Sequence, residues 1–258
     1  MPKIVVIGGS GRIGEKLVRN LRQEDCRVFE ASRSWGVDSV TGVGLADALT
    51  DAEIVIDVSN SPSLEGADAL RFFEASGRNL VAAGRAAGVR HHIALSIVGV
   101  DGLVASDYFR AKKIQEDLIK ASGIPFTILR STQFFEFISD VVQDGTAQEI
   151  AIAPALVQPI AGEDVAETLA DAAFSDPFDA TIEVAGPEQF RLDAVATEIA
   201  TAHEDSRRVV ADIHARYFGA ELAERSLLPG PDARIASLKF DDWLRQSLRP
   251  ARTSTLSG

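Results

Sequence analysis

The beginning of the chain reads as a buried strand, a tight turn and a helix, and this unit constrains the fold more than any other segment. Residues 4–7 form a continuous apolar run, which is typical of a strand covered on both faces. Glycines follow at Gly8, Gly11 and Gly14, and the apolar residues after them recur on one side of a helix. Such a turn aims backbone N–H groups and the positive end of the helix at one point, where only glycine lets a pyrophosphate approach closely. The sequence therefore predicts a dinucleotide site at the first turn of an α/β fold.

The rest of the first half alternates short apolar runs with segments of helical periodicity. The strands expected from this pattern cover 27–31, 54–58, 93–98 and 126–129, and the helices cover 65–87 and 107–121. Strands separated by helices imply right-handed crossovers. We therefore expect a doubly wound parallel α/β sheet, Rossmann-like in its organisation.

The second half has a looser rhythm and no Pro/Gly/Ser-rich linker before it. Helices are expected over 134–142, 162–174, 192–202 and 240–248, strands over 181–184 and 209–213, and a loop or short strand over 151–160. We predict a nucleotide-binding core over residues 1–150 and a smaller substrate lobe, integrated with it, over 151–248. Residues 249–258 are polar and aperiodic, which predicts a disordered tail.

Composition narrows the class of partner. The chain carries 26 Lys and Arg against 38 Asp and Glu, a formal net charge of −12, so direct binding to nucleic acid is not expected. A single cysteine, Cys26, fits a reducing compartment. With no membrane-length apolar run, no leader and no metal-ligand spacing among its histidines, the chain is expected to be cytoplasmic, without a membrane partner or a metal site. Whether it is a monomer or a homodimer stays open.

The end of the second predicted strand bears on the choice of cofactor. An acidic residue there holds the ribose hydroxyls in NAD-preferring sites, whereas this strand ends Ala-Ser32-Arg33-Ser34. An arginine fork suits a 2′-phosphate, so we predict a preference for NADP(H) over NAD(H), with Arg33 as anchor and Ser32 and Ser34 as helpers. The alternative is that Arg33 is a solvated surface residue and Glu30 turns inward instead.

A serine, a tyrosine and a lysine form the candidate catalytic group. Ser96 lies at the end of an apolar strand, where open parallel sheets place their ligand crevice. Tyr108 and Lys112 are four residues apart on a predicted helix and so project from one face. A nearby ammonium favours the phenolate, so Lys112 is expected to lower the pKa of Tyr108.

Aromatic residues shortly after the strand expected over 126–129 suggest a substrate wall. Gln133, Phe134 and Phe135 lie where substrate or nicotinamide would sit, although phenylalanines at this spacing also fit a core. The segments 217–218 and 227–228 are candidate lid residues from the small lobe.

These motifs resemble the short-chain dehydrogenase/reductase superfamily, and within it the atypical NmrA-like branch. The resemblance spans residues 3–248 and rests on 8–14, 31–33, 57–60, 95–99, 108–112 and 127–130. It implies that the turn residues bind the pyrophosphate, namely Gly8, Ser10, Gly11, Arg12, Ile13 and Gly14. It also implies that Val58, Ser59 and Asn60 line the passage from adenine to ribose, and that Lys112 holds the nicotinamide ribose. Ser96 and Tyr108 match the catalytic pair of the superfamily.

Three functions are compatible with this pattern. The first is an NADP-dependent reductase of a small carbonyl, enone or quinone, in which Tyr108 supplies the proton. The second is a non-catalytic NADP(H)-binding redox sensor, because many NmrA-like members lack the tyrosine that this chain keeps. The third is a nucleotide-sugar epimerase or dehydratase. That function requires phosphate-binding arginines in the second half, for which the candidates are Arg191, Arg207, Arg208, Arg216 and Arg234.

Overall fold

The computed structural model describes residues 1–63, 66–143 and 148–249, and a seven-stranded parallel sheet forms its centre. The strand order is β11-β8-β5-β4-β3-β1-β2. The strands are β1 (Lys3–Ile7), β2 (Arg27–Ala31), β3 (Ile54–Asp57), β4 (His91–Ile97), β5 (Phe126–Ser131), β8 (Ala180–Ala185) and β11 (Arg234–Ile235). All pairings within this sheet are parallel. The predicted doubly wound fold is confirmed.

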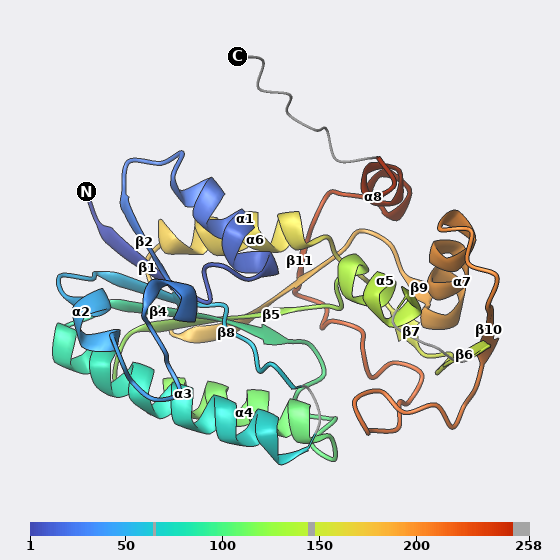
Figure 1. The fold of residues 1–258 in the computed structure, drawn as a ribbon, viewed down its shortest axis with the longest axis horizontal. Helices are drawn as coiled ribbons and strands as arrows, with labels where there is room; N and C mark the ends of the chain where they lie inside the picture. Colours follow the sequence, from blue (N-terminus) through green and yellow to red (C-terminus); the bar gives the residue numbers. More distant parts are fainter. Residues whose placement is uncertain (64–65, 144–147, 250–258) are drawn as a thin grey trace.

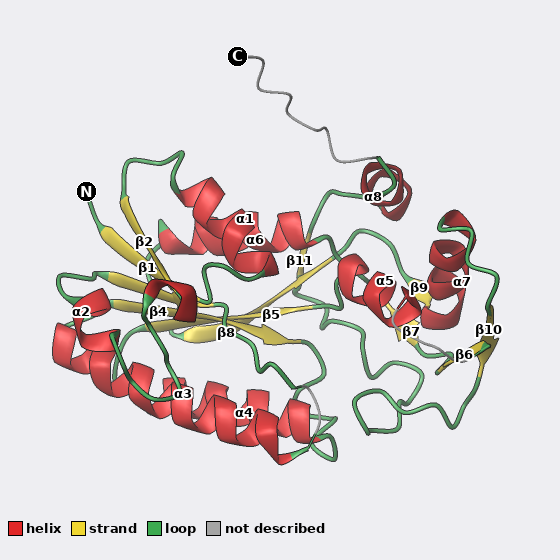
Figure 2. Cartoon of the chain, viewed as in Figure 1, coloured by secondary structure: helices red, strands yellow, loops and turns green. Residues whose placement is uncertain are grey.

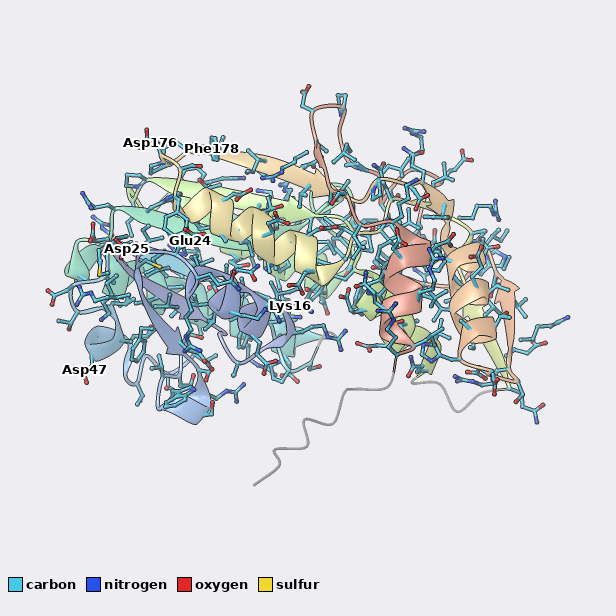
Figure 3. The ribbon with its side chains drawn as sticks, turned by 90° about the horizontal axis from the view of Figure 1, so that it is seen from above. Lys16, Glu24, Asp25, Asp47, Asp176 and Phe178 are labelled. Atoms are coloured by element: carbon cyan, nitrogen blue, oxygen red, sulfur yellow. The ribbon has the colours of Figure 1, made fainter. Side chains whose placement is uncertain are left out.

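Helices cover both faces of the sheet (Figure 1). Helices α1 (Arg12–Leu21) and α6 (Gly162–Ala173) lie side by side on one face, as Figure 3 shows from above. Lys16, labelled there on α1, donates to Glu163 of α6 at 3.1 Å. The other face carries α2 (Leu45–Leu49), α3 (Ala67–Ala87) and α4 (Asp107–Lys120). No helix in the described part of the chain combines the length and apolar character needed to cross a membrane.

A smaller lobe lies at one end of the sheet (Figure 2). Its elements are α5 (Phe135–Gln143), β6 (Glu149–Ile152), β7 (Leu156–Val157), β9 (Phe190–Arg191), α7 (Leu192–Ala202), β10 (Arg208–Ala211) and α8 (Phe240–Ser247). The lobe has its own apolar core, in which the rings of Phe135 and Trp243 stack with centroids 5.1 Å apart. The chain enters the lobe three times, and between these visits it returns to the sheet first through α6 and β8 and then through β11. The division near residue 150 stays a prediction, and elements on both sides of it build the sheet.

The expected elements differ from the observed ones mainly at their ends and where they are short. Helix α2 and the 3-10 turn Arg33–Trp35 escape prediction because neither is long enough to show a period. Strand β4 begins at His91, earlier than expected, because two buried histidines continue the apolar run into the sheet. Of the predicted tail, only Arg249 lies within the described residues.

His91 couples the stability of the sheet to pH. Its side chain is 3 % exposed, and its Nε2 lies 2.9 Å from the Thr127 hydroxyl on β5. Burial, helped by the charge of His92, lowers the pKa of His91 to about 4 from 6.5. The unfolded chain therefore binds the proton more readily, so stability is full above pH 6.5 and falls as the pH drops towards 4. We expect His91 to account for about 3 kcal/mol of this loss.

Urea unfolding between neutral pH and pH 4 measures this effect. His91→Gln is expected to flatten the pH dependence of the free energy of unfolding, whereas replacement of the exposed His214 by Gln is the matched control and keeps the wild-type slope. An unchanged slope in His91→Gln contradicts the assignment.

Candidate functional site

A cleft of about 750 Å³ lies along the carboxyl ends of the central strands. It starts beside the glycine turn and the end of β2, passes the ends of β3 and β4, and reaches the lobe beyond β5. Most residues predicted for the site line it: Gly8, Ser10, Gly11, Arg12, Ile13, Ser32, Arg33, Ser34, Val58, Ser59, Asn60, Ser96, Tyr108, Lys112, Gln133 and Phe134. The fold thus brings together side chains that are far apart in the sequence.

The glycine turn is shaped by close backbone contacts. Gly8 has φ +80°, and a Cβ on it would lie 2.8 Å from the backbone of Ser59. A Cβ on Gly14 would lie 2.1 Å from the Gly8 carbonyl oxygen, so Gly14 faces the turn and lets α1 approach it, and it does not line the cleft. At the mouth of the cleft, Arg12 of α1 pairs with Asp140 of α5 at 2.7 Å. The turn therefore leaves the first N–H groups of α1 open to an anion.

Gly14→Ala is expected to abolish nucleotide binding, because the new methyl group forces the Gly8 carbonyl and the turn apart. We expect the NADPH Kd to rise by at least about 100-fold, as loss of the phosphate contacts predicts. Isothermal calorimetry measures the Kd, with circular dichroism to confirm the fold. Gly84→Ala is the matched control, since its Cβ would meet only side-chain atoms of Ile124 and Val89 in α3 packing. Equal affinities in the two variants contradict this role of Gly14.

The end of β2 presents a cation to the cleft. Arg33 is exposed and makes no ion pair with any described residue. Beside it, the hydroxyls of Ser32 and Ser34 lie 2.8 Å apart. Glu30 does not line the cleft, because its carboxylate accepts a hydrogen bond from the Trp35 indole at 3.1 Å. The arrangement suits an anionic group near Arg33.

One carboxylate in this part of the cleft was not anticipated. Asp38 lines the cleft, and its Oδ1 accepts hydrogen bonds from the backbone N–H groups of Val40 and Thr41. It follows strand β2 by several residues and lies in a loop, so strand-end reasoning does not find it. Its side chain caps its own loop.

Lys112 is held in a buried polar network. Its ammonium donates to the Leu95 carbonyl at 2.7 Å and to the side chain of Gln115. Gln115 in turn donates to Asp57 at 2.7 Å, and Asp57 accepts from the Ser59 hydroxyl at 2.6 Å. Burial lowers the pKa of Lys112 to about 8, although the nearby carboxylates Asp57 and Glu116 oppose that shift. Asp57 lies in the motif 57–60, but no pattern in the sequence predicts its hydrogen bond to Gln115, which belongs to no recognised motif.

Ser96 and Tyr108 have separate partners. The Ser96 hydroxyl donates to Glu116 at 2.7 Å, and Glu116 is paired with Arg130 at 2.7 Å. The Tyr108 hydroxyl donates to Asn60 Oδ1 at 3.3 Å. Neither Ser96 nor Lys112 is hydrogen-bonded to Tyr108 in the described part of the chain.

The expectation that Lys112 lowers the pKa of Tyr108 is wrong. Burial of the phenol raises the pKa of Tyr108 to about 12, and the hydrogen bond to Asn60 only partly offsets it. The physical reason is that aromatic rings surround the phenol while the lysine ammonium is committed to other oxygens. Tyr108 therefore holds its proton throughout the neutral range.

Aromatic side chains form the wall of the cleft next to Tyr108. The Phe218 ring stacks on Tyr108 with centroids 4.9 Å apart and on Phe137 with centroids 5.3 Å apart. Phe218 and its neighbour Tyr217 come from the lobe and line the cleft, as the lid hypothesis requires for this segment. Phe135, predicted for the substrate wall, instead lies 1 % exposed in the core of the lobe. Phe137, two residues further along α5, points in a different direction from the helix and lines the cleft instead of Phe135.

The arginines of the second half do not gather at the cleft. Each forms an ion pair with a nearby acid, and none lines the cleft: Arg191 with Asp193, Arg207 with Asp205, Arg208 with Glu149, Arg216 with Glu221 and Arg234 with Asp171. The diphosphate site that a nucleotide-sugar enzyme needs is thus not assembled from these residues.

Two curated proteins match about half of the chain. The photosystem II assembly factor Ycf39 of Cyanophora paradoxa is 27% identical over 147 residues, covering 52% of this chain and 46% of that protein. The (4-alkanoyl-5-oxo-2,5-dihydrofuran-3-yl)methyl phosphate reductase of Streptomyces griseus is 30% identical over 146 residues, covering 51% of this chain and 48% of the reductase. The chain thus spans about half the length of these relatives.

Solved structures share the fold over nearly the whole chain. MoeE5 in complex with UDP-glucose and NAD has a TM-score of 0.70 at 19% identity, covering 96% of this chain and 100% of that one. The dTDP-4-dehydrorhamnose reductase of Bacillus anthracis in complex with NADP has a TM-score of 0.67 at 13% identity, covering 96% and 93%. Identities this low establish the fold and no more.

A family model described as NAD(P)H-binding matches residues 36–176, which is more than half of the 258-residue chain. This match confirms the predicted NAD(P)-binding family, and the solved structures confirm the Rossmann-like fold. The chain belongs to the NAD(P)H-binding family.

Proposed function

We propose that this protein is an NADPH-dependent reductase of a small carbonyl, enone or quinone. The observation that carries the proposal is that one cleft extends from the glycine turn and Arg33 to Ser96, Tyr108 and Lys112. A cofactor-binding end and a proton-donating end thus lie on one continuous surface. The similarity to a protein named as a reductase points the same way.

The residues of the cleft fit NADPH. The turn at Gly8 and Gly11 suits the pyrophosphate, and the guanidinium of Arg33, which pairs with no acid among the described residues, suits the adenosine 2′-phosphate. Lys112, which reaches the cleft beside the end of β4, suits the nicotinamide ribose. When bound, the cofactor supplies a hydride to the substrate.

Tyr108 is the proposed proton donor. A tyrosine with a pKa near 12 is a poor base but remains protonated at neutral pH, which is the state needed to give a proton to an oxygen that gains negative charge. The proposed direction is therefore reduction. Ser96 is proposed as a positioning residue, because its hydroxyl already donates to Glu116 and ties the end of β4 to the Glu116–Arg130 pair.

The substrate side of the cleft favours a flat, uncharged ring. Phe218 is stacked between Tyr108 and Phe137, so a planar substrate that displaces this ring meets two aromatic faces. The paired arginines of the lobe disfavour a nucleotide sugar. Activity on a quinone or a conjugated enone fits this surface best.

An NADP(H)-binding regulator is the second candidate. The observation that favours it is that Phe218 covers Tyr108, which leaves the phenol stacked and half-buried. The similarity to a protein named as an assembly factor is compatible with this reading. Such a protein binds the nucleotide without turning it over.

NADPH oxidation in the presence of quinones, enones, aldehydes and ketones separates the candidates. The reductase predicts turnover with one of these classes, faster with NADPH than with NADH. Tight NADPH binding without turnover on any class favours the regulator. Failure to bind either nucleotide contradicts both.

A further inference from the structure

Phe218 has a backbone conformation that phenylalanine rarely adopts. Its φ is +49°, and the φ of the following Gly219 is +81°. The Tyr217 N–H donates to the Ala220 carbonyl at 2.9 Å, and the Ala220 N–H donates to the Tyr217 carbonyl at 3.0 Å. These are the features of a two-residue hairpin turn of type I′, whose central positions favour Asn, Asp or Gly. A phenylalanine at the first of them strains the backbone, so the surrounding structure has to compensate.

The compensating contact is a stack of aromatic rings in the cleft. The planes of Phe218 and Tyr108 meet at 28° with centroids 4.9 Å apart, and those of Phe218 and Phe137 meet at 24° with centroids 5.3 Å apart. In the described part of the chain no ring contact joins Tyr108 to Phe137 directly. All three side chains line the cleft. The space between the Tyr108 and Phe137 rings, here called the aromatic slot, is thus filled by a residue of the chain itself.

The stem of the turn is anchored, whereas its tip borders open space. Ala220 is 2 % exposed and belongs to the core of the lobe, and Arg216 donates to the Gly219 carbonyl at 3.3 Å. Gly219 is exposed, and a Cβ on it would meet no atom within 4 Å. A rotation of the Phe218 side chain therefore empties the aromatic slot without unfolding the turn, at the loss of two ring contacts.

We propose that Phe218 determines substrate specificity by reserving the aromatic slot for flat, uncharged molecules with fused rings. The Phe218 ring and the substrate ring compete for the same two faces. A molecule enters only if its contacts with Tyr108 and Phe137 exceed those of one phenyl ring. A fused bicyclic ring, as in a naphthoquinone, meets this condition because it covers more aromatic surface. A small aldehyde or an aliphatic ketone does not.

The surroundings of the slot select against charge as well as against small size. Burial raises the pKa of Tyr108 to about 12, so the environment that opposes a phenolate also opposes a charged ligand on the same ring. A neutral ring in the slot lies on the proposed proton donor. The inference thus rests on the proposed function, for which it names the substrate class.

Equilibrium binding of indole tests the inference without requiring turnover. Indole is flat, uncharged and bicyclic, and it has no carbonyl group to reduce. Phe218→Asn removes the competing ring, and asparagine suits the positive φ of the turn, so this variant is expected to fold. Calorimetry on the full chain is expected to show a Kd for indole about tenfold lower in Phe218→Asn than in the wild type, as removal of two competing ring contacts predicts.

Two further variants show whether the gain comes from the slot. Phe174→Ala removes a phenylalanine that is 48 % exposed and does not line the cleft, and it is expected to keep the wild-type Kd. Adding Phe137→Leu to Phe218→Asn removes one face of the slot, and it is expected to raise the Kd for indole again by about fivefold. If Phe218→Asn does not fold, Phe218→Gly also fits the turn and is expected to give the same gain.

The outcomes separate this inference from the proposed function. Weaker indole binding in a folded Phe218 variant shows that Phe218 is a contact surface for the ligand and overturns the inference. An unchanged Kd, no detectable binding, or a gain that survives Phe137→Leu overturns it as well. NADPH oxidation with 1,4-naphthoquinone tests the reductase separately. If Phe218→Asn tightens indole binding but no form of the protein reduces the quinone, the slot stands and the reductase fails. Turnover with a quinone KM that Phe218→Asn leaves unchanged overturns the inference and supports the reductase.

Discussion

Replacing Tyr108 with phenylalanine is expected to lower kcat for NADPH-dependent reduction by about 100-fold or more, with the NADPH Kd kept within about twofold. The change removes the phenolic proton but keeps the ring that stacks on Phe218. Since the raised pKa of Tyr108 keeps the phenol protonated, its loss removes the proton donor and leaves the cofactor-binding surface intact. Steady-state kinetics and a fluorescence titration of NADPH measure the two quantities.

Tyr217→Phe is the comparison for this experiment, because Tyr217 lines the same cleft and its hydroxyl bonds to no described residue. We expect its loss of kcat to be much smaller than that of Tyr108→Phe. Equal losses in the two variants, or an unchanged kcat in Tyr108→Phe, contradict the assignment of Tyr108 as proton donor.

Replacing Arg33 with alanine is expected to raise the NADPH Kd by about 10- to 100-fold and to leave the NADH Kd within about twofold. The guanidinium is exposed and unpaired among the described residues, so its charge is available to the 2′-phosphate that NADH lacks. Because the site is open to solvent, the effect is also expected to shrink as salt is added.

Arg27→Ala tests whether the effect of Arg33→Ala is specific. Arg27 is an exposed arginine on the same strand, β2, and does not line the cleft. Its variant is expected to bind both nucleotides like the wild type. A loss of affinity in Arg33→Ala that is equal for NADPH and NADH shows that Arg33 does not bind the 2′-phosphate.

Local patterns predicted much of the fold because their causes are local. The apolar run before Gly8, the helix that begins at Arg12 and the strand 27–31 are set by residues within one turn or one strand. Helix α7 also begins and ends where its periodicity predicts, at Leu192 and Ala202. The short helix α2 is stabilised by packing against α3, and its five residues are too few to show a helical pattern in the sequence.

The site was less predictable where contacts cross long stretches of chain. Glu116 lies on α4, 20 residues after Ser96, yet its carboxylate accepts the hydrogen bond of the Ser96 hydroxyl. Arg130, on the strand that follows α4, forms an ion pair with the same carboxylate. The pKa of Tyr108 depends on rings such as Phe218, which the lobe brings back from the far half of the chain. Phe135 packs in the core of the lobe, whereas Phe137 lines the cleft. The packing of α5 within the lobe decides which of these two phenylalanines faces the cleft, and the sequence pattern alone does not show it.

Calorimetric titration of the wild-type protein with NADPH, followed by the same titration with NADH, tests the central claim most directly. One NADPH is expected to bind per chain with a Kd in the low micromolar range or below, and NADH at least about tenfold more weakly. Saturable heat with NADPH at this stoichiometry supports a cleft built for a phosphorylated dinucleotide. Absence of NADPH binding, or a lower Kd for NADH than for NADPH, contradicts the claim.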